Sequence, residues 1–491
     1  MDQADIVVIG AGTGGAVCAL TAARCGLHTV LVEQTGEVGG VAATTLMGSW
    51  ANLLVNTDMQ KMTGGIILEI LERMVAQSAT PYRTLQEAVE GKIGKPFTIP
   101  FQPVWYAQVL SEMLREAGVR LLLNTVFTGG EELPDGRKDL HFAFGPKAIA
   151  VKARVVVDAT GNADVAASLG AEVTSIKTGT ETYGCLMRIA NVDIDKTLCY
   201  IRERRPWEPD TGFTAWLSQK MADCPDKNRR RLGYLGDPVT YDHAPMEHAK
   251  DNLLTPERFA YIEERYRREG VIYTLELCLL RQLMRTAADR GDFILDDCKD
   301  GLRGVTFNGD GIAYGGWGDG VALCNVAKPY GFNPADAEER TCAVLAARDY
   351  NIMFYRFLQK YVPGFENGYL LDMGQQTVAR GSRMIVGCDD AKTLAQSPLY
   401  AQPVYIFGGI YRHQMGIPVP YGKIVSRNKV NLFAVGKCAS HGMQYRSQIS
   451  CMSMGVAAAT AADLICSQGC TSHTLRPEEL AERLKRMEVV I

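Results

Sequence analysis

Four β-branched residues followed at once by glycines open this sequence. Residues 6–9 read Ile-Val-Val-Ile, which is typical of a parallel strand buried on both faces. Gly10, Gly12 and Gly15 then fit the spacing G-x-G-x-x-G, and residues 16–25 have the composition of a helix. A strand, a glycine turn and a helix in this order predict the start of a Rossmann-type α/β fold.

Each glycine of this turn has its own physical task. Gly10 permits the tight turn, Gly12 lets the backbone approach a pyrophosphate, and Gly15 allows the helix to pack closely on the strand. Thr13 and Gly14 lie at the start of the helix, where backbone N–H groups point at bound phosphates. We therefore expect these five residues to hold a dinucleotide.

An acidic residue closes the second predicted strand. Residues 28–33 read His-Thr-Val-Leu-Val-Glu, so Glu33 lies at the strand's carboxyl end. A carboxylate there accepts hydrogen bonds from both ribose hydroxyls and repels a 2′-phosphate, which argues against NADP. The pattern alone leaves NAD and FAD open.

A glycine doublet follows the acidic strand end, in the segment Gln-Thr-Gly-Glu-Val-Gly-Gly-Val-Ala. Gly39 and Gly40 in this place resemble the extended FAD fingerprint of the glutathione-reductase-like flavoproteins. The resemblance implies a loop that runs along the pyrophosphate toward the flavin, with contacts from Gln34, Val41 and Ala42. It favours FAD over NAD.

A second resemblance lies at residues 155–164, Val-Val-Val-Asp-Ala-Thr-Gly-Asn-Ala-Asp. The three valines predict a buried strand. Ala159, Thr160 and Gly161 resemble the ATG turn of the same fold, in which the glycine lets the backbone pass close to the cofactor. The resemblance implies two further cofactor contacts, Val126 and Asp164.

A third segment resembles the C-terminal flavin segment of these proteins. Residues 432–435 predict a strand that ends at Gly436, and a helix rich in small residues begins near Ser450. The helix dipole would stabilise negative charge on the flavin's pyrimidine ring, with Ile449 and the next three residues against the isoalloxazine. Lys437 stands where many such proteins have Asp, and its ammonium either meets a phosphate or points to solvent.

Together these segments are similar to the broad family of bacterial FAD-dependent oxidoreductases that contains the flavoprotein part of the heterodisulfide reductases. The similarity extends over most of the chain and is weakest between residues 202 and 302. It implies an FAD-binding domain of the glutathione-reductase type that holds FAD without a covalent bond. A covalent link through His441 or Cys438 is the alternative, and no linkage motif supports it.

A chain of 491 residues is too long for one ordinary core, so we expect two domains, or one with a large insertion. The three cofactor segments lie far apart in sequence, so the FAD-binding domain must be discontinuous. It is predicted at residues 1–60, 97–185 and 400–470. Residues 186–400 are predicted to form an inserted α+β substrate or cap domain, and residues 471–491 a helical C-terminal tail.

Few side chains in the predicted flavin segments can move a proton or bind an anion. Of 7 histidines, His413 and His441 lie in those segments, and an imidazole is suited to removing a hydroxyl proton. Arg380, Arg383 and Arg446 are anion-binding candidates, because a guanidinium holds a carboxylate with two parallel hydrogen bonds. The alternatives are buried structural histidines and structural salt bridges.

The charge balance excludes several classes of partner. A net charge of −3 leaves no strongly basic surface for nucleic acid or an anionic membrane.

No stretch reaches the roughly 18 apolar residues of a membrane helix, and the first residues lack the pattern of a signal peptide. The 14 cysteines include no CxxC pair, which indicates reduced thiols and no metal site. We expect a cytoplasmic protein, with a homodimer left open.

The expected activity is the dehydrogenation of a small polar molecule, such as a sugar or a hydroxy acid, at a hydroxyl or C–H bond. FAD would accept the hydride at N5, and the sequence does not identify the electron acceptor that follows. Reduction of an activated double bond is the main alternative. An RNA-modifying flavoprotein and an NAD-dependent dehydrogenase are further alternatives, disfavoured by the near-neutral charge and by the glycine doublet.

Overall fold

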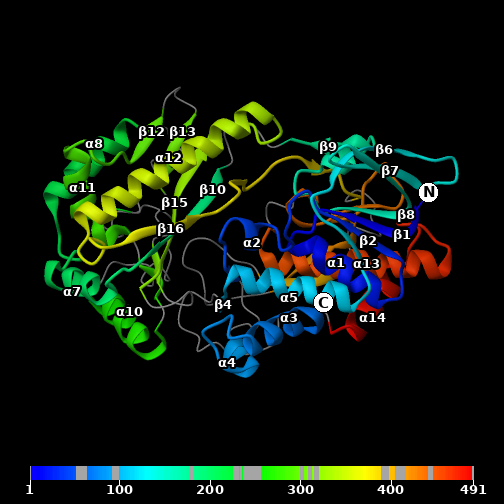
Figure 1. Ribbon diagram of the computed structural model, residues 1–491, viewed down its shortest axis with the longest axis horizontal. Coiled ribbons are helices and arrows are strands. Elements are labelled where there is room, and N and C mark those ends of the chain that lie inside the picture. The colour runs from blue at the N-terminus through cyan, green and yellow to red at the C-terminus, as the bar shows by residue number, and fades with distance from the viewer. Residues whose placement is uncertain are drawn as a thin grey trace. The chain divides into compact units, whose positions relative to one another are not determined.

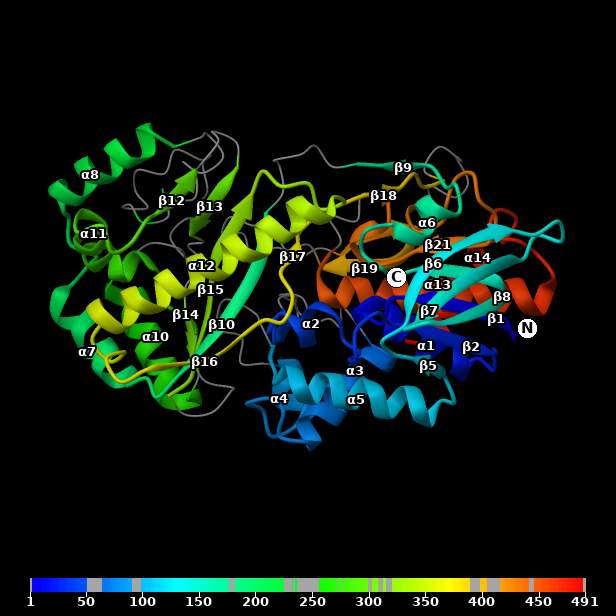
Figure 2. The ribbon, with the colours of Figure 1, turned by 45° about the horizontal axis from the view of Figure 1, so that its top comes forward.

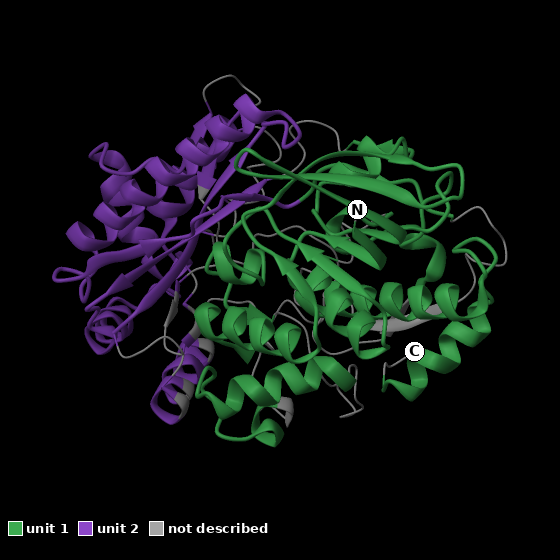
Figure 3. Cartoon of the chain, turned by 45° about the vertical axis from the view of Figure 1, so that its right-hand side comes forward, with its two compact units in different colours: residues 1–176, 381–405, 412–491 green, residues 177–380, 406–411 purple. Residues whose placement is uncertain are grey.

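Two compact units make up the protein (Figure 3). Unit 1 consists of residues 1–176, 381–405 and 412–491, and unit 2 of residues 177–380 and 406–411. The computed structural model describes residues 2–50, 64–90, 99–175, 182–224, 232, 235, 256–270, 272–275, 277–298, 303–307, 312–314, 320–388, 398–403, 416–440 and 446–488.

A seven-stranded sheet with the order β5-β2-β1-β8-β7-β6 forms the centre of unit 1, and β21 also pairs with β8 (Figures 1 and 2). Strands β5, β2, β1, β8 and β21 are parallel, whereas β6, β7 and β8 form an antiparallel meander. The bounds are β1 Asp2–Ile9, β2 Thr29–Val32, β5 Arg120–Leu122, β6 Val126–Glu132, β7 Lys138–Phe144, β8 Lys147–Asp158 and β21 Leu432–Ala434. All four strands predicted from the sequence occur in the parallel part, which confirms the mixed α/β fold.

Alternate residues of β1 enter two separate cores. Ile6 and Val8 lie in the core that contains helices α1 (Thr13–Arg24) and α13 (Gln448–Gln468). Val7 and Ile9 lie in the core shared with β7 and helix α6 (Asp164–Ser168). Side chains alternate across a strand, so a continuous β-branched run is what a strand buried on both faces requires.

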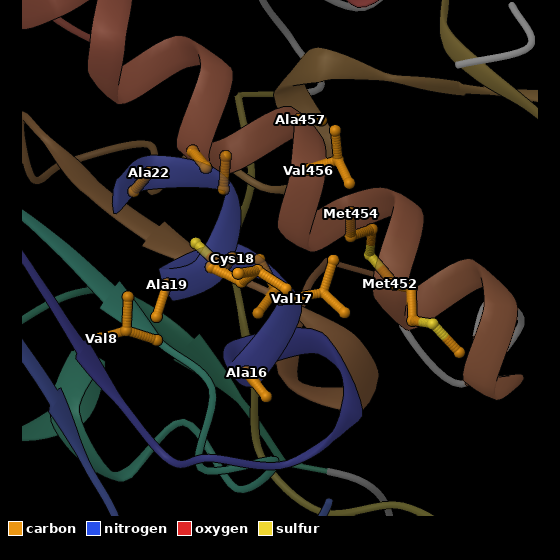
Figure 4. Packing of buried hydrophobic residues seen from close by; sticks show 14 of the residues in the cluster. Val8, Ala16, Val17, Cys18, Ala19, Ala22, Met452, Met454, Val456 and Ala457 are labelled. Atoms are coloured by element: carbon orange, nitrogen blue, oxygen red, sulfur yellow. The ribbon is translucent and has the colours of Figure 1, made fainter. Parts of the chain in front are cut away.

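Helices α1 and α13 pack against each other through glycines and small side chains (Figure 4). A Cβ atom at Gly455 of α13 would overlap the Gly14 carbonyl oxygen of α1 and lie 3.0 Å from the Cys18 nitrogen. By length and composition α13 could cross a membrane, yet 78% of its apolar window is buried inside the structure. Packing in this core therefore accounts for its apolar character.

Shorter elements complete unit 1. Helices α3 (Gly65–Ala76), α5 (Pro103–Glu116) and α14 (Pro477–Arg486) contribute side chains to the same core as α1 and α13. Three short strand pairs are β3 with β4, β9 with β18, and β19 with β20. The remaining bounds are α2 Val41–Thr44, β3 Ser49–Trp50, α4 Leu85–Glu90, β4 Ile99–Pro100, β9 Val173–Thr174, β18 Met384–Ile385, β19 Pro398–Pro403, β20 Gly416–Pro420, η5 Tyr421–Lys423 and η6 Gly436–Cys438.

Unit 2 is built on an antiparallel sheet with the order β11-β14-β15-β10-β16, to which β12, β13 and β17 are added. Helix α12 (Ala337–Tyr361) packs on one face, where Cys185 and Met187 of β10 share a buried cluster with Phe354. Asn351 Nδ2 donates a hydrogen bond of 3.2 Å to the Cys185 carbonyl oxygen.

The other elements of unit 2 have the following bounds: α7 Ile194–Arg204, α8 Thr211–Ala222, α10 Pro256–Glu269, β10 Tyr183–Ala190, β11 Ile272–Leu275, η4 Leu277–Leu280, α11 Arg281–Asp289, β12 Asp296–Cys298, β13 Gly304–Phe307, β14 Ile312–Tyr314, β15 Ala322–Tyr330, β16 Tyr369–Met373 and β17 Val378–Ala379. An antiparallel sheet with helices on it is an α+β arrangement.

The units divide the chain at positions that differ from those predicted. Residues 177–185, expected in the FAD-binding domain, belong to unit 2, because β10 is an interior strand of its sheet. Residues 381–399, expected in the cap domain, belong to unit 1, where β18 pairs with β9. The helix predicted in the C-terminal tail is present as α14, but it is no separate segment, because Leu480 and Leu484 are fully buried in the core of unit 1.

A buried carboxyl group at the end of β8 fixes the turn that follows. Asp158 Oδ1 accepts hydrogen bonds from Thr160 N at 3.0 Å and from Thr160 Oγ1 at 2.7 Å. Asp158 Oδ2 accepts one from Ala166 N, in α6, at 2.9 Å. Burial raises the pKa of Asp158, and the hydrogen bonds offset only part of the shift. The carboxyl group thus connects β8, the turn and α6.

Gly455→Ala should destabilise the protein through the contact between α1 and α13. The added methyl group would overlap the backbone of α1, and overpacking of this kind costs about 2–3 kcal/mol of unfolding free energy. Urea unfolding measures this loss. The control is Gly469→Ala at the end of the same helix, where no atom lies within 4 Å and only the positive φ is strained, at about 1 kcal/mol. Equal losses in the two variants would contradict the prediction.

Asp158→Asn should lower the free energy of unfolding by about 1–3 kcal/mol, because an amide nitrogen would face the Ala166 N–H group. The raised pKa also means that folding favours the protonated carboxyl group. The associated stability is present below about pH 4, the ordinary range of an unfolded Asp, and is lost as pH rises toward the folded pKa. Unfolding by urea across pH should show this loss in the wild type and not in the variant.

The control for the pH dependence is Asp135→Asn. Asp135 is exposed, and its hydrogen bond with Arg137 lowers its pKa, so this variant should keep the loss of stability that Asp158 causes. If the unfolding free energy of Asp158→Asn retained the wild-type dependence on pH, the assignment of this pH-dependent loss of stability to Asp158 would be refuted.

Candidate functional site

Four strands end side by side at one edge of the sheet of unit 1. In the order β2, β1, β8 and β21, the residues that follow the strand ends include Glu33, Gly10, Ala159 and Gly436. Gly10 N donates to Val32 O at 2.7 Å and Ala159 N to Ile9 O at 2.8 Å, which ties neighbouring strand ends together. Parallel strands place their carboxyl ends at one edge, so three segments far apart in sequence meet here.

Two glycines of the first turn are required by the fold itself. Gly10 has a φ of +101°, and a Cβ atom there would lie 2.5 Å from the Ala159 carbonyl oxygen. A Cβ atom at Gly15 would overlap the Gly10 carbonyl oxygen and come 2.8 Å from Ala159 Cβ. The turn therefore packs directly on the end of β8.

Gly12 differs from the glycines on either side of it. The nearest atom to a Cβ built on Gly12 is Gly40 Cα, at 3.9 Å, so the fold leaves this position open. Gly12 is also the N-cap of α1, where no side chain caps the helix and no acidic residue occupies the first turn. Backbone N–H groups at an uncapped helix start are suited to bind phosphate.

The glycine doublet lies directly on the first turn. Gly39 N donates a hydrogen bond of 2.8 Å to Ala11 O, and Gly39 forms an isolated parallel bridge with Gly12. Gly40 has a φ of +53°, and its Cβ would lie 2.7 Å from Gly12 Cα. The chain after β2 is thus held against the open position.

The Glu33 carboxylate is buried and organised by backbone donors. Oε2 accepts from Ala11 N at 2.7 Å, and Oε1 accepts from Thr35 N at 2.8 Å. Oε1 also accepts from Thr35 Oγ1 at 2.9 Å, whereas Oε2 can accept a further hydrogen bond, which leaves capacity for a hydroxyl ligand. Val126 follows Thr125, whose N–H donates to Glu33 O at 2.9 Å, so the structure brings this predicted contact to the same strand end.

A polar cluster joins the ATG turn to two other segments. Arg383 forms an ion pair with Asp164, and its Nε donates to Asn162 O at 3.2 Å. The guanidinium that the sequence predicts to bind a substrate anion is therefore paired with a carboxylate of its own chain. Lys437 Nζ donates to Asn162 Oδ1 at 3.3 Å, and a Cβ on Gly161 would lie 2.8 Å from Lys437 Cε. The lysine thus lies along the turn that contains Gly161.

The other predicted contacts fall into two groups. Gln34 and Val41 are exposed, whereas Ala42 and Ile449 are almost fully buried in the core that contains α1 and α13. Thr13 Oγ1 donates to Gly39 O at 3.4 Å. Their roles toward a cofactor remain predictions.

The catalytic predictions are only partly located. His413 and His441 lie outside the described residues. Arg446 is half-buried and precedes α13, and Arg380 is the last residue of the main segment of unit 2. Among the residues that the structure describes, no group of three or more His, Cys, Asp or Glu could hold a metal ion.

A glutamine that the sequence analysis does not predict holds the loop after the glycine doublet. Gln448, the first residue of α13, donates from Nε2 to Met47 O at 3.1 Å and to Ser49 O at 3.2 Å. Ser447 caps the helix, because its Oγ accepts from Ser450 N at 3.3 Å. A polar residue just after a serine cap is the only signal for it in the sequence.

An aromatic group borders the same loop. Trp50, Phe101 and Tyr106 are fully buried, and the Trp50 and Tyr106 rings meet edge-on with centroids 6.4 Å apart. The Tyr106 ring lies 3.3 Å from the Cβ position of Gly39. Burial raises the pKa of Tyr106 well above its ordinary value, and the nearby Thr13 side chain offsets a part of the shift. The signal in the sequence is a tyrosine on a buried helix face, where its hydroxyl needs a partner.

Comparison with known proteins gives relatives of the same chemical class. Digeranylgeranylglycerophospholipid reductase 1 of Methanococcoides burtonii is 25% identical over 260 residues, 51% of this chain and 59% of that protein. The 3-oxosteroid 1-dehydrogenase of Mycolicibacterium smegmatis is 43% identical over 60 residues, 12% of this chain and 10% of that protein. The aligned part is thus less than two thirds of the length of these relatives.

Among solved structures, a geranylgeranyl bacteriochlorophyll reductase-like protein from Thermoplasma acidophilum is similar over 100% of this chain and 84% of its own, with a TM-score of 0.41 and 12% identity. A p-nitrophenol 4-monooxygenase from Pseudomonas putida is similar over 97% of this chain and 84% of its own, with a TM-score of 0.41 and 11% identity.

The family model described as FAD dependent oxidoreductase matches residues 5–391 and 409–484, which is most of the chain. The match includes every segment that meets at the strand-end edge. This chain therefore belongs to the FAD dependent oxidoreductase family, as an enzyme with FAD as its cofactor.

Proposed function

We propose that this enzyme is a dehydrogenase that oxidises a hydroxyl or C–H bond of a small polar molecule, such as a sugar or a hydroxy acid. The observation that supports the cofactor site is the row of strand ends, with the open, uncapped Gly12 position at its centre. Bound FAD supplies a hydride acceptor at its N5 atom. The protein supplies the binding, the orientation and the proton transfer.

The residues along the edge fit the parts of FAD in order. The Glu33 carboxylate suits the ribose hydroxyls of the adenosine, and Gly12 with the first turn of α1 suits the pyrophosphate. Gly436 and the start of α13, at the other end of the row, suit the isoalloxazine. The antiparallel β6–β8 meander beside the parallel strands supports a domain of the glutathione-reductase type.

Two charged side chains lie on the central sheet of unit 2. Arg188 of β10 points away from α12, because Met187 and Ile189 on either side of it point into the cluster that α12 covers. There it forms an ion pair with Asp372 of β16. Lys328 of β15 is 1% exposed and donates to Asn325 Oδ1. Both charged groups already have partners within the chain, so the substrate of this proposal is to be identified by assay.

Two roles follow for this chain's own side chains. His441 or His413 takes the hydroxyl proton while the hydride leaves the adjacent carbon. Arg446, next to the start of α13, orients an anionic group of the substrate. Arg383 supports the ATG turn through Asp164 and Asn162. The enzyme acts in the cytoplasm and passes its electrons to an acceptor that is still to be identified.

Reduction of an activated double bond is the second candidate. The archaeal relative is named a reductase, and its alignment covers the larger share of this chain. The mycobacterial relative is named a dehydrogenase, and its shorter alignment has the higher identity. The direction of turnover separates the two activities.

Turnover with dyes tests the direction of the reaction. We expect the purified holoenzyme to reduce an artificial electron acceptor when given a substrate from a panel of sugars and hydroxy acids. The same substrate should bleach the visible absorbance of the bound flavin under anaerobic conditions, because the hydride is transferred to it. Turnover only with a reduced dye and an activated alkene would overturn the dehydrogenase assignment.

Gly12→Ala and Gly15→Ala should separate cofactor binding from folding. At Gly12 the methyl group meets no protein atom within 3.9 Å, so the FAD-free protein should unfold at an unchanged temperature. FAD affinity should fall at least about tenfold, or roughly 1.4 kcal/mol, because the methyl group occupies the phosphate approach. Gly15→Ala, one turn away, should instead destabilise the FAD-free protein, since its methyl group overlaps backbone. Unchanged FAD affinity in Gly12→Ala would refute the placement of the pyrophosphate.

A further inference from the structure

A buried hydrogen-bond acceptor without a partner lies at the start of α13. Both N–H bonds of the Gln448 side chain are used, because Nε2 donates to the carbonyl oxygens of Met47 and Ser49. These two acceptors fix the orientation of the amide, since the flipped amide would place Oε1 against two carbonyl oxygens. In the described part of the chain, Gln448 Oε1 is buried and has no hydrogen-bond partner.

An acceptor in this state destabilises the protein unless a partner is supplied. Leaving a buried polar group unpaired costs about 1–3 kcal/mol, and most such groups have a partner in the protein, in water or in a ligand. The two hydrogen bonds of Nε2 hold the side chain in place, so Oε1 cannot turn toward solvent without breaking them. The orientation of the amide therefore presents an acceptor to a donor that this chain does not supply.

Two more unpartnered polar atoms lie in the same neighbourhood. Trp50 Nε1 and the Tyr106 hydroxyl belong to fully buried side chains and have no partner in hydrogen-bonding geometry within the described ranges. Trp50 directly follows Ser49, whose carbonyl oxygen accepts from Gln448, and the Tyr106 ring borders Gly39. Trp50 and Tyr106 are fully enclosed by the core, whereas the Gln448 side chain is only half-buried, so Gln448 Oε1 is the one of the three atoms next to which a ligand fits.

The order of the strands identifies which part of the ligand is nearest. Glu33 follows β2 at one end of the row, Gly12 follows β1, and α13 follows β21 at the other end. With the adenosine at Glu33 and the pyrophosphate at Gly12, the isoalloxazine extends toward α13. Oxidised isoalloxazine has one N–H donor, at N3. A buried acceptor of fixed orientation is complementary to it.

We propose that Gln448 contacts the cofactor: its Oε1 accepts a hydrogen bond from the isoalloxazine N3–H, while its Nε2 holds the loop at Met47 and Ser49. This inference rests on the FAD placement proposed above. One side chain thereby connects the C-terminal segment, the loop after the glycine doublet and the pyrimidine edge of the flavin. It sets the position of the flavin relative to that loop.

The test compares the binding of FAD with the binding of FAD that carries a methyl group on N3. The wild-type apoprotein should bind FAD about tenfold tighter than the methylated cofactor, a difference of about 1.4 kcal/mol, because methylation removes the donor. In Gln448→Leu this ratio should fall to about one. The matched control is Gln468→Leu at the far end of α13, where the glutamine bonds to Glu479 on the surface, and it should keep the wild-type ratio.

The possible results distinguish a failure of the Gln448 contact from a failure of the proposed function. Equal wild-type affinities for the two cofactors, or a wild-type ratio retained in Gln448→Leu, would overturn the contact. No binding of FAD to the wild type would instead defeat the proposed function. If Gln448→Leu does not fold, as judged by circular dichroism, exchange of the N3 proton in wild-type holoenzyme decides. Slow exchange with deuterated solvent supports the contact, and exchange as fast as in free FAD refutes it.

Discussion

The turn that leads into α1 is enclosed by backbone at Gly10, Gly14 and Gly15, with no room for a Cβ atom at these three positions. Gly10 and Gly15 pack on each other and on the end of β8, and a Cβ atom at Gly14 would lie 2.8 Å from the Cys451 carbonyl oxygen of α13. On the α13 side, Gly455 lies against the same turn, because a Cβ atom there would overlap the Gly14 carbonyl oxygen. Close approach of backbones is possible only where Cβ atoms are missing. The positions of β1, β8 and α13 therefore all depend on this contact.

The same contact leaves one position open. With Gly10, Gly14 and Gly15 against protein atoms, Gly12 is the glycine of the turn that no protein atom approaches closely. The uncapped N–H groups of α1 lie beside it, and the glycine doublet closes over its far side. Packing and ligand binding are thus divided among neighbouring residues of one motif, which is why substitutions three residues apart have different expected effects.

Polar side chains hold the segments around this edge together. Asp158 connects β8 to α6, and Arg383 with Lys437 connects the ATG turn to two distant parts of the chain. Each of these groups has a partner within the chain, and each acts on the shape of the site. Gln448 differs, because one half of its amide has partners and the other has none.

The sequence by itself determined the elements that local patterns encode. A β-branched run needs burial on both faces, and glycines at fixed spacing need a turn with close backbone contact, so the parallel strands, the turn at Gly10 and the binding of a dinucleotide could be predicted. The choice of FAD came from the resemblance to known flavoproteins. The family match confirms the resemblance to FAD-dependent oxidoreductases. The substrate could not be predicted, since the side chains that recognise it come together only in the folded molecule and leave no local motif.

Only the tertiary structure decided which distant residues meet. The pairing of Arg383 with Asp164, the place of β10 in unit 2 and the burial of α14 depend on contacts between segments far apart in the chain. The same holds for Gln448, whose free acceptor is defined by two carbonyl groups about four hundred residues earlier. Local pattern fixes the conformation of a segment, whereas the partner of each buried polar group is decided only by the packing of distant segments.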